Sequence, residues 1–95
     1  MFHAYILTIV AIQDSDAFDS YRAAVAPVNA AIGGQVMLRG PTAAIIEGSG
    51  AEREAVIIIG FPDIAAATAY ITAAEYTALA GLRQAAGQFT IRVIG

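Results

Sequence analysis

Two segments of this chain are apolar on both faces of the strand that each would form. The first runs from Phe2 to Ile12 and the second from Glu54 to Phe61. A strand with one face in water alternates apolar and polar residues, whereas these two segments place apolar side chains at odd and even positions alike. Both strands are therefore expected to be covered on both sides, which restricts the architecture more than any other feature.

A first helix is predicted between these two strands. Asp14 is a typical N-cap, and apolar residues recur every three or four positions from Phe18 to Ile32. Pro27 removes one backbone hydrogen bond, so we expect a kink or a two-part helix at that position. Gly33-Gly34 is expected to end the helix.

The segment after this helix is predicted to be one bent strand. Gln35 to Arg39 and Thr42 to Glu47 both have strand character, and Gly40-Pro41 separates them. A tight hairpin at Gly40-Pro41 is the alternative. We prefer a bulge there because Gly48-Ser49-Gly50 makes a better hairpin loop.

The last third of the chain is predicted to be helical until its final strand. Asp63 is the N-cap of a second helix, and a break near Ala73-Ala74 separates it from helical spacing over Glu75 to Ala86. Gln88 to Ile94 is the last predicted strand. No linker or internal repeat divides the sequence, so residues 1–95 are expected to be a single domain.

The resulting order, βαββαβ, predicts an α+β fold of the ferredoxin-like split βαβ type. In this fold two helices cover one face of a four-stranded antiparallel sheet. The other face is then bare, although the first and third strands are apolar on both sides. Such a patch is larger than a monomer normally exposes, so we expect a homodimer in which a second sheet covers it.

The composition excludes several classes of function. The chain has 5 basic residues, all of them arginine, and a net charge of −3, so it lacks the basic surface of a nucleic-acid-binding protein. With no cysteine and a single histidine, disulfides, thiolate sites and multi-histidine metal sites cannot form within one chain. We therefore expect neither a metal nor another cofactor.

Targeting and membrane signals are also missing from the sequence. The N-terminus has no basic region or cleavage site of a signal peptide, and nearly uncharged stretches such as Ile64 to Ala74 are too short to cross a bilayer. A cytoplasmic protein without a membrane partner is the expectation.

Short motifs in a fixed order along the chain are typical of one protein family. They are Tyr5, DSDAFDSY (with Asp14, Phe18 and Tyr21), Gly33-Gly34, Arg39-Gly40, Glu47-Gly48, Phe61-Pro62, AAEYTALAGLR (with Glu75, Tyr76, Leu79 and Arg83) and Gly95. Through these motifs the chain resembles the bacterial domain-of-unknown-function 1330 family, part of the dimeric α+β barrel superfamily, over essentially its whole length. Pro41, Tyr70 and Ala73-Ala74 depart from the usual glycine, tryptophan and Ser-Pro of the family.

The resemblance has implications for assembly and none for chemistry. It implies a homodimer whose two sheets enclose a barrel-like cavity. It implies no agreed activity, so any site must be inferred from the residues themselves.

Arg39 and Glu47 are the first candidate ligand-binding residues. They are eight positions apart, so an unbroken strand would place both on one face. Either they form an ion pair, or Arg39 binds an anionic ligand and Glu47 acts as a base or orients it. We expect Arg39 to hold the carboxylate of a small, partly aromatic acid. Arg92 is the main rival, and Arg22 is expected on the exposed side of the first helix.

Four more residues are candidates for the wall of such a site. Tyr76 and Arg83 are two turns apart on one helix face. Tyr76 is more typical of a packed core residue than of a ligand-binding one, and Arg83 needs a partner near the core edge. His3 and Tyr5 lie on one face of the first strand, so both would line a cavity on that side.

Three kinds of function remain open at this point. The first is a small homodimer that binds a carboxylate or aromatic molecule in the barrel. The second is a cofactor-independent enzyme, monooxygenase- or isomerase-like, acting on a small aromatic or lactone substrate, which rests on analogy with the superfamily. The third is an accessory or structural dimer without a ligand. The volume and lining of the cavity distinguish them.

Overall fold

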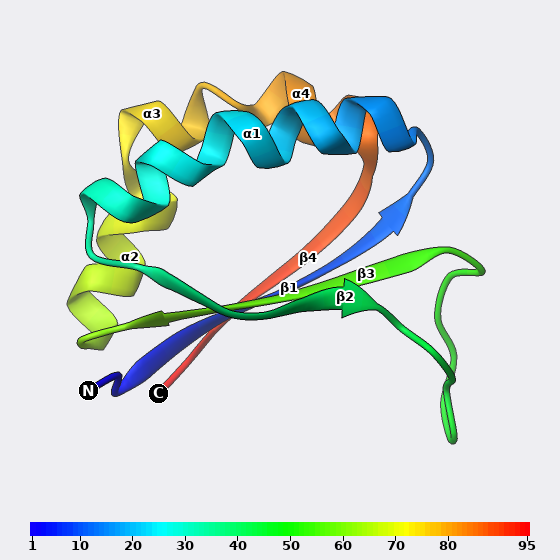
Figure 1. Cartoon of the computed structure of the whole chain (residues 1–95), viewed down its shortest axis with the longest axis horizontal. Coiled ribbons are helices and arrows are strands. Elements are labelled where there is room, and N and C mark those ends of the chain that lie inside the picture. Colours follow the sequence, from blue (N-terminus) through cyan, green and yellow to red (C-terminus); the bar gives the residue numbers. More distant parts are fainter.

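The helices of the protein all lie on one face of its four-stranded antiparallel sheet (Figure 1). This arrangement comes from a computed structural model that describes residues 1–95. The elements in chain order are β1 (Ala4–Ile12), α1 (Ser15–Ala31), β2 (Gln35–Pro41), β3 (Glu54–Phe61), α2 (Ile64–Thr72), α3 (Ala74–Thr77), α4 (Ala80–Ala86) and β4 (Gly87–Ile94). The strand order β2-β3-β1-β4 is that of the predicted ferredoxin-like fold.

Helix α1 begins where the sequence predicts but is not divided at Pro27. Asp14 Oδ1 accepts a hydrogen bond from Ala17 N at 3.1 Å, which satisfies one of the free N–H groups at the helix start. The helix then runs through Pro27 as one element. Ala23 and Pro27 are both exposed, so water can hydrate the carbonyl that the proline leaves without a donor. Of the two expected alternatives, the two-part helix is wrong, and the kink stays a prediction.

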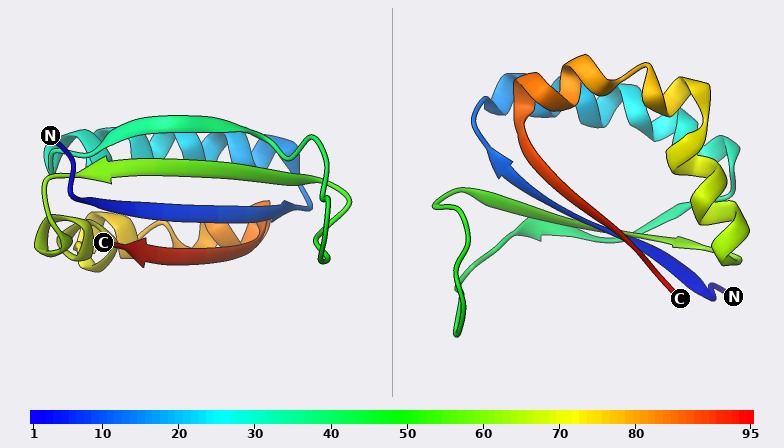
Figure 2. Two further views of the ribbon diagram at one scale, coloured as in Figure 1. Left: turned by 90° about the horizontal axis from the view of Figure 1, so that it is seen from below. Right: turned by 180° about the vertical axis from the view of Figure 1, so that it is seen from behind.

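The expected strand over residues 42–47 is also wrong. Pairing of β2 with β3 ends at Pro41 and Ala55, because β3 begins at Glu54 and offers no partner to the residues beyond Thr42. Thr42 Oγ1 and Glu54 Oε1, 2.6 Å apart, close the base of this segment. Residues 42–53 project from the sheet on the side away from the helices (Figures 1 and 2). The β-bulge of β2 lies between Val36 and Leu38 rather than at Gly40-Pro41.

The helical region over 75–86 divides into α3 and α4. The Tyr76 carbonyl accepts hydrogen bonds from the Leu79 N–H and from Arg83 Nη1, each at 3.0 Å. The bond from Leu79 is a tight i to i−3 turn, which ends α3 before α4 starts at Ala80. One continuous helix there is not observed.

Alternating burial along β1 separates the two faces of the sheet. Ala4, Ile6, Thr8 and Val10 are buried against the helices, and the residues between them are only half-buried. We call the second side the open face. Its residues from the four strands include Tyr5, Leu7, Ile9, Leu38, Val56, Ile58 and Arg92.

None of the helices is both long and apolar enough to cross a membrane.

Candidate functional site

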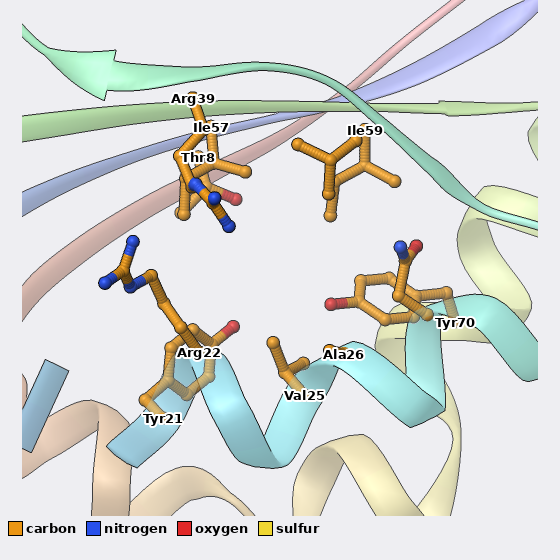
Figure 3. Close-up of a pocket in the computed structure, with 11 residues that line it drawn as sticks. Thr8, Tyr21, Arg22, Val25, Ala26, Arg39, Ile57, Ile59 and Tyr70 are labelled. Carbon is orange, nitrogen blue, oxygen red and sulfur yellow. The ribbon is translucent and has the colours of Figure 1, made fainter. Parts of the chain in front are cut away.

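A small cavity lies between α1 and the helix-covered face of the sheet. Its volume is about 80 Å³, and β1, β2, β3, α1 and α2 all contribute to its wall. We call it the inner cavity (Figure 3). It is on the opposite face of the sheet from the expected cavity between two sheets, which involves a second copy and stays a prediction.

The β-bulge at Met37 determines which side chains of β2 reach this cavity. Val36 pairs with Ile59 and Arg39 pairs with Ile57, and all four residues line the cavity. Residues three apart would point to opposite faces of a regular strand, and the extra residue in the bulge brings them to the same face. Arg39 is thereby directed toward α1 instead of toward the open face.

Two arginines approach the inner cavity from opposite walls. Arg39 extends from β2 and Arg22 from α1 toward the same space (Figure 3). Arg22 Nη2 lies 2.7 Å from Asp19 Oδ1, and its guanidinium is 5.3 Å from the Phe18 ring centroid. This is the one salt bridge of the chain, so Arg39 has no carboxylate partner. Arg22 Nε is buried without a hydrogen-bond acceptor.

Two tyrosine hydroxyls face each other across the same cavity. Tyr21 from α1 and Tyr70 from α2 point into it, with the Thr8 hydroxyl on the sheet side (Figure 3). Burial raises the pKa of both tyrosines far above the ordinary value, and the neighbouring Tyr76 adds to the effect. Like any tyrosine, whose ordinary pKa is 10.0, both are protonated at neutral pH, and each phenol has one O–H donor.

Asn29 completes the polar part of the wall. It is 7% exposed, and its Oδ1 is buried without a hydrogen-bond partner. Gly34 leaves the space that this amide occupies, because a Cβ there would overlap Asn29 Oδ1. An unpaired buried amide oxygen is unfavourable by about 1–3 kcal/mol, and this one lies beside Gly34.

A second, outer cavity of about 230 Å³ adjoins the first and shares Arg22 and Arg39 with it. Ser15, Asp19 and Glu54 contribute to its more polar wall. The two arginines therefore stand between a polar outer cavity and an inner cavity with largely aliphatic walls. No group of three or more His, Asp or Glu side chains is arranged to hold a metal ion.

The candidate residues from the sequence occupy three different places. Arg39 lines both cavities. Tyr76 is buried next to Tyr70, with ring centroids 4.9 Å apart, and the Arg83 guanidinium lies 4.3 Å from the Tyr76 ring centroid. Tyr76 and Arg83 thus support the wall from behind.

The remaining candidates lie away from the inner cavity. Glu47 is in the projecting segment 42–53, so the structure does not bring it to Arg39. His3 is exposed before β1, Tyr5 lies on the open face, and Arg92 pairs with Leu7 on that same face.

Most residues of the cavity wall are not among the candidates predicted from the sequence. Arg22 faces the cavity, so its expected place on the exposed side of the first helix is wrong. Helical spacing in the sequence could have indicated this. Arg22, Val25-Ala26 and Asn29 are three or four positions apart, so they form a stripe along one side of α1. This stripe adjoins the apolar one that starts at Phe18 and Tyr21. In the sequence Tyr21 belongs to a family motif and Tyr70 departs from the usual tryptophan, which predicts no role in a site for either, and no local pattern points to Thr8.

Solved structures with the same fold come from proteins of unknown function. A protein from Rhodopseudomonas palustris has 21% sequence identity and a TM-score of 0.77, covering 96% of this chain and 79% of that chain. A methylated form of that protein gives a TM-score of 0.79 at 21% identity, over 96% and 78% of the two chains.

A more distant structure carries a suggested activity. This conserved protein of unknown function from Bacteroides thetaiotaomicron is described as a possible oxidoreductase, with 12% identity and a TM-score of 0.62 over 96% of this chain and 94% of that chain. At such identities these similarities establish the fold alone. None of the curated proteins matches the chain at a significant level.

The family assignment comes from the sequence itself. The model of the family described as "Domain of unknown function (DUF1330)" matches residues 3–95, which include all four strands and the whole wall of the inner cavity. The protein therefore belongs to the DUF1330 family.

Proposed function

We propose that this protein binds a small organic acid, with the carboxylate of the acid between Arg22 and Arg39. The observation that carries the proposal is the approach of two guanidinium groups, from α1 and β2, to one space. Arginine presents a planar set of donors that fits a carboxylate in a bidentate manner.

The charges at this position support an anionic ligand. Two like charges that face one cavity repel each other, and water screens this repulsion in part because Arg39 is exposed and the Arg22 side chain is 36% exposed. Asp19 compensates only part of this charge, because its side chain is 63% exposed and it pairs with Arg22 alone. A carboxylate between the two arginines would compensate both.

The wall of the inner cavity favours a short organic acid over an inorganic anion. Val25, Ala26, Val36, Ile57 and Ile59 are all aliphatic. A cavity of roughly 150 Å³ accepts benzene, so one of about 80 Å³ takes roughly three or four non-hydrogen atoms beyond the carboxylate. This size favours an aliphatic acid over the aromatic acid that the sequence led us to expect.

We also propose that a second copy of the chain covers the open face. Leu7, Ile9, Val56 and Ile58 line up on neighbouring strands there, and no helix of the same chain covers them. A sheet from a second copy is the simplest cover for an apolar surface of this shape. The ligand site lies on the other side of the sheet, so ligand binding does not depend on this assembly.

Substitution of Arg39 tests the ligand proposal. Butanoate titrated into ¹⁵N-labelled protein should shift amide signals of α1 and β2, with a Kd in about the millimolar range for so small a ligand. Arg39→Ala should weaken binding about tenfold or more, because a hydrogen bond to a charged group contributes about 1.5–3 kcal/mol. Its melting temperature should stay close to that of the wild type, since Arg39 has no ion pair to lose.

Arg92→Ala is the matched control. It removes the same charge from the open face of the sheet, so butanoate affinity should not change. Equal affinity of Arg39→Ala and wild type, or no binding of butanoate by the wild type, would show that the two arginines are not an acid-binding site.

A further inference from the structure

We propose that the acid bound in the inner cavity carries a hydroxyl group at the end opposite its carboxylate. This inference rests on the proposed function and defines the class of ligand more closely, as a short ω-hydroxy acid. It concerns the part of the inner cavity beyond the two arginines, where the polar groups are uncharged.

The hydroxyls of Tyr21 and Tyr70 are two of the uncharged polar groups in this cavity. They point into the cavity from α1 and α2 (Figure 3). Phenols that remain protonated at neutral pH can donate to an oxygen atom of the ligand, and they offer no compensation for a second negative charge. An uncharged oxygen therefore suits this end of the cavity better than a second carboxylate does.

Asn29 indicates whether the uncharged oxygen of the ligand belongs to a carbonyl or to a hydroxyl group. Its Oδ1 is an unpaired acceptor in a side chain that is almost fully buried. A carbonyl oxygen of the ligand can only accept, whereas a hydroxyl both donates and accepts. A hydroxyl can therefore pair with the amide whichever of its two polar atoms faces the ligand, and with a tyrosine at the same time.

The residues that line each cavity indicate where the two ends of the ligand lie. Arg22 and Arg39 belong to the outer as well as the inner cavity, but Tyr21, Tyr70 and Asn29 line only the inner one. A ligand that enters from the outer cavity thus leaves its carboxylate at the arginines and places its far end among the hydroxyls. Aliphatic side chains such as Val25 and Ile57 line the same cavity.

A pair of acids of equal size tests this inference. 4-Hydroxybutanoate and pentanoate differ by a hydroxyl in place of a methyl group, so they have nearly the same length and volume. In the wild type 4-hydroxybutanoate should bind about tenfold more tightly, because pentanoate leaves the buried polar groups without partners. The affinities come from amide-shift titrations on the full chain.

Tyr→Phe variants test whether the preference for 4-hydroxybutanoate over pentanoate arises in the inner cavity. Tyr70→Phe and Tyr21→Phe should each reduce the preference to about threefold or less, mainly by weakening the binding of the hydroxy acid. Tyr5→Phe removes a hydroxyl from the open face and should keep the full preference. Arg39→Ala should weaken both acids by the same factor, since it acts on the carboxylate that they share.

The possible results separate this inference from the proposed function. Equal affinity of the two acids, or a preference that survives both Tyr→Phe variants, overturns the hydroxy-acid inference, while dependence on Arg39 would still support acid binding. Loss of the preference in Tyr70→Phe or Tyr21→Phe but not in Tyr5→Phe supports it. If neither acid binds the wild type, the inference and the proposed function are both wrong.

Discussion

Burial of Tyr21 and Tyr70 links the cavity to the stability of the fold. These side chains are 4% and 2% exposed, and their rings pack on Phe89 and Phe61 with centroids 5.1 and 5.4 Å apart. Desolvation penalises the phenolate in the folded state, whereas the unfolded chain leaves both phenols in water. Proton binding by the two tyrosines therefore differs between the two states at alkaline pH.

The free energy of unfolding should consequently fall above the ordinary tyrosine pKa of 10.0. The folded-state pKa is raised, so the stabilisation is complete below pH 10 and is lost as the unfolded chain releases protons that the folded chain retains. The loss should approach about 1.4 kcal/mol per pH unit for each tyrosine. Urea denaturation from about pH 8 to about pH 11 measures it.

Phenylalanine variants test the origin of this pH dependence. Tyr70→Phe should flatten the alkaline decline, because it removes one of the two buried phenols. The same slope in Tyr70→Phe and wild type would mean that Tyr70 ionises as freely in the folded chain as in the unfolded one.

Single residues also explain why only part of the site could be predicted. Arg39 was identified from its type and its position in a predicted strand. The opposite wall escaped because the bulge at Met37 and the rotation of α1, which turns Arg22 inward, depend on packing between segments distant in the sequence. Glu47 would share a face with Arg39 only in an unbroken strand, and β2 ends at Pro41.

At the scale of elements, side-chain caps determine where the first two helices begin. Asp14 Oδ1 accepts from Ala17 N at 3.1 Å, and Asp63 Oδ1 accepts from Ala66 N at 2.7 Å. Both aspartates have extended backbone dihedral angles, as N-cap residues do. These two positions were predictable because a cap depends on only four consecutive residues.

Asp14→Ala should lower the free energy of unfolding by about 1 kcal/mol without changing the fold. The loss comes from an unpaired N–H at Ala17 and from a weaker interaction with the helix dipole. Ser20→Ala, at an exposed position within α1, is the control and should change the stability by less than about 0.5 kcal/mol. Equal stability of Asp14→Ala and wild type in urea denaturation would contradict the role of this cap.

The strands show how well local sequence patterns predict the bounds of whole elements. β3 spans Glu54–Phe61, the residues predicted, and β1 begins two residues later than predicted. These strands lie in the middle of the sheet, where neighbouring strands flank them and the helices cover one face, so apolar residues are favoured there. Residues 42–47 have strand propensity but no partner strand, and propensity alone does not form a strand.

At the scale of the whole molecule, the sheet separates two surfaces with different expected roles. Its helix-covered face holds the inner cavity and the two arginines. Its open face presents apolar side chains such as Leu7 and Ile58 without a cover. Assembly through the open face would leave the entrance to the cavity free, because Arg22 and the N-terminal part of α1 lie on the other side of the sheet.

Ile58→Arg tests the proposed assembly, because it places a charge in the middle of the open face. Ile58 pairs with Leu7 and Leu38 on neighbouring strands and is half-buried in the single chain. In a monomer the arginine could extend into water, so the chain should still fold. In the dimer the same charge would be buried without a partner, at a free-energy cost of several kcal/mol.

Light scattering at micromolar concentration should therefore give a dimer for the wild type and a folded monomer for Ile58→Arg. Ile64→Arg, on the exposed start of α2, should remain a dimer, and a wild-type protein that is monomeric at this concentration would refute the proposed assembly.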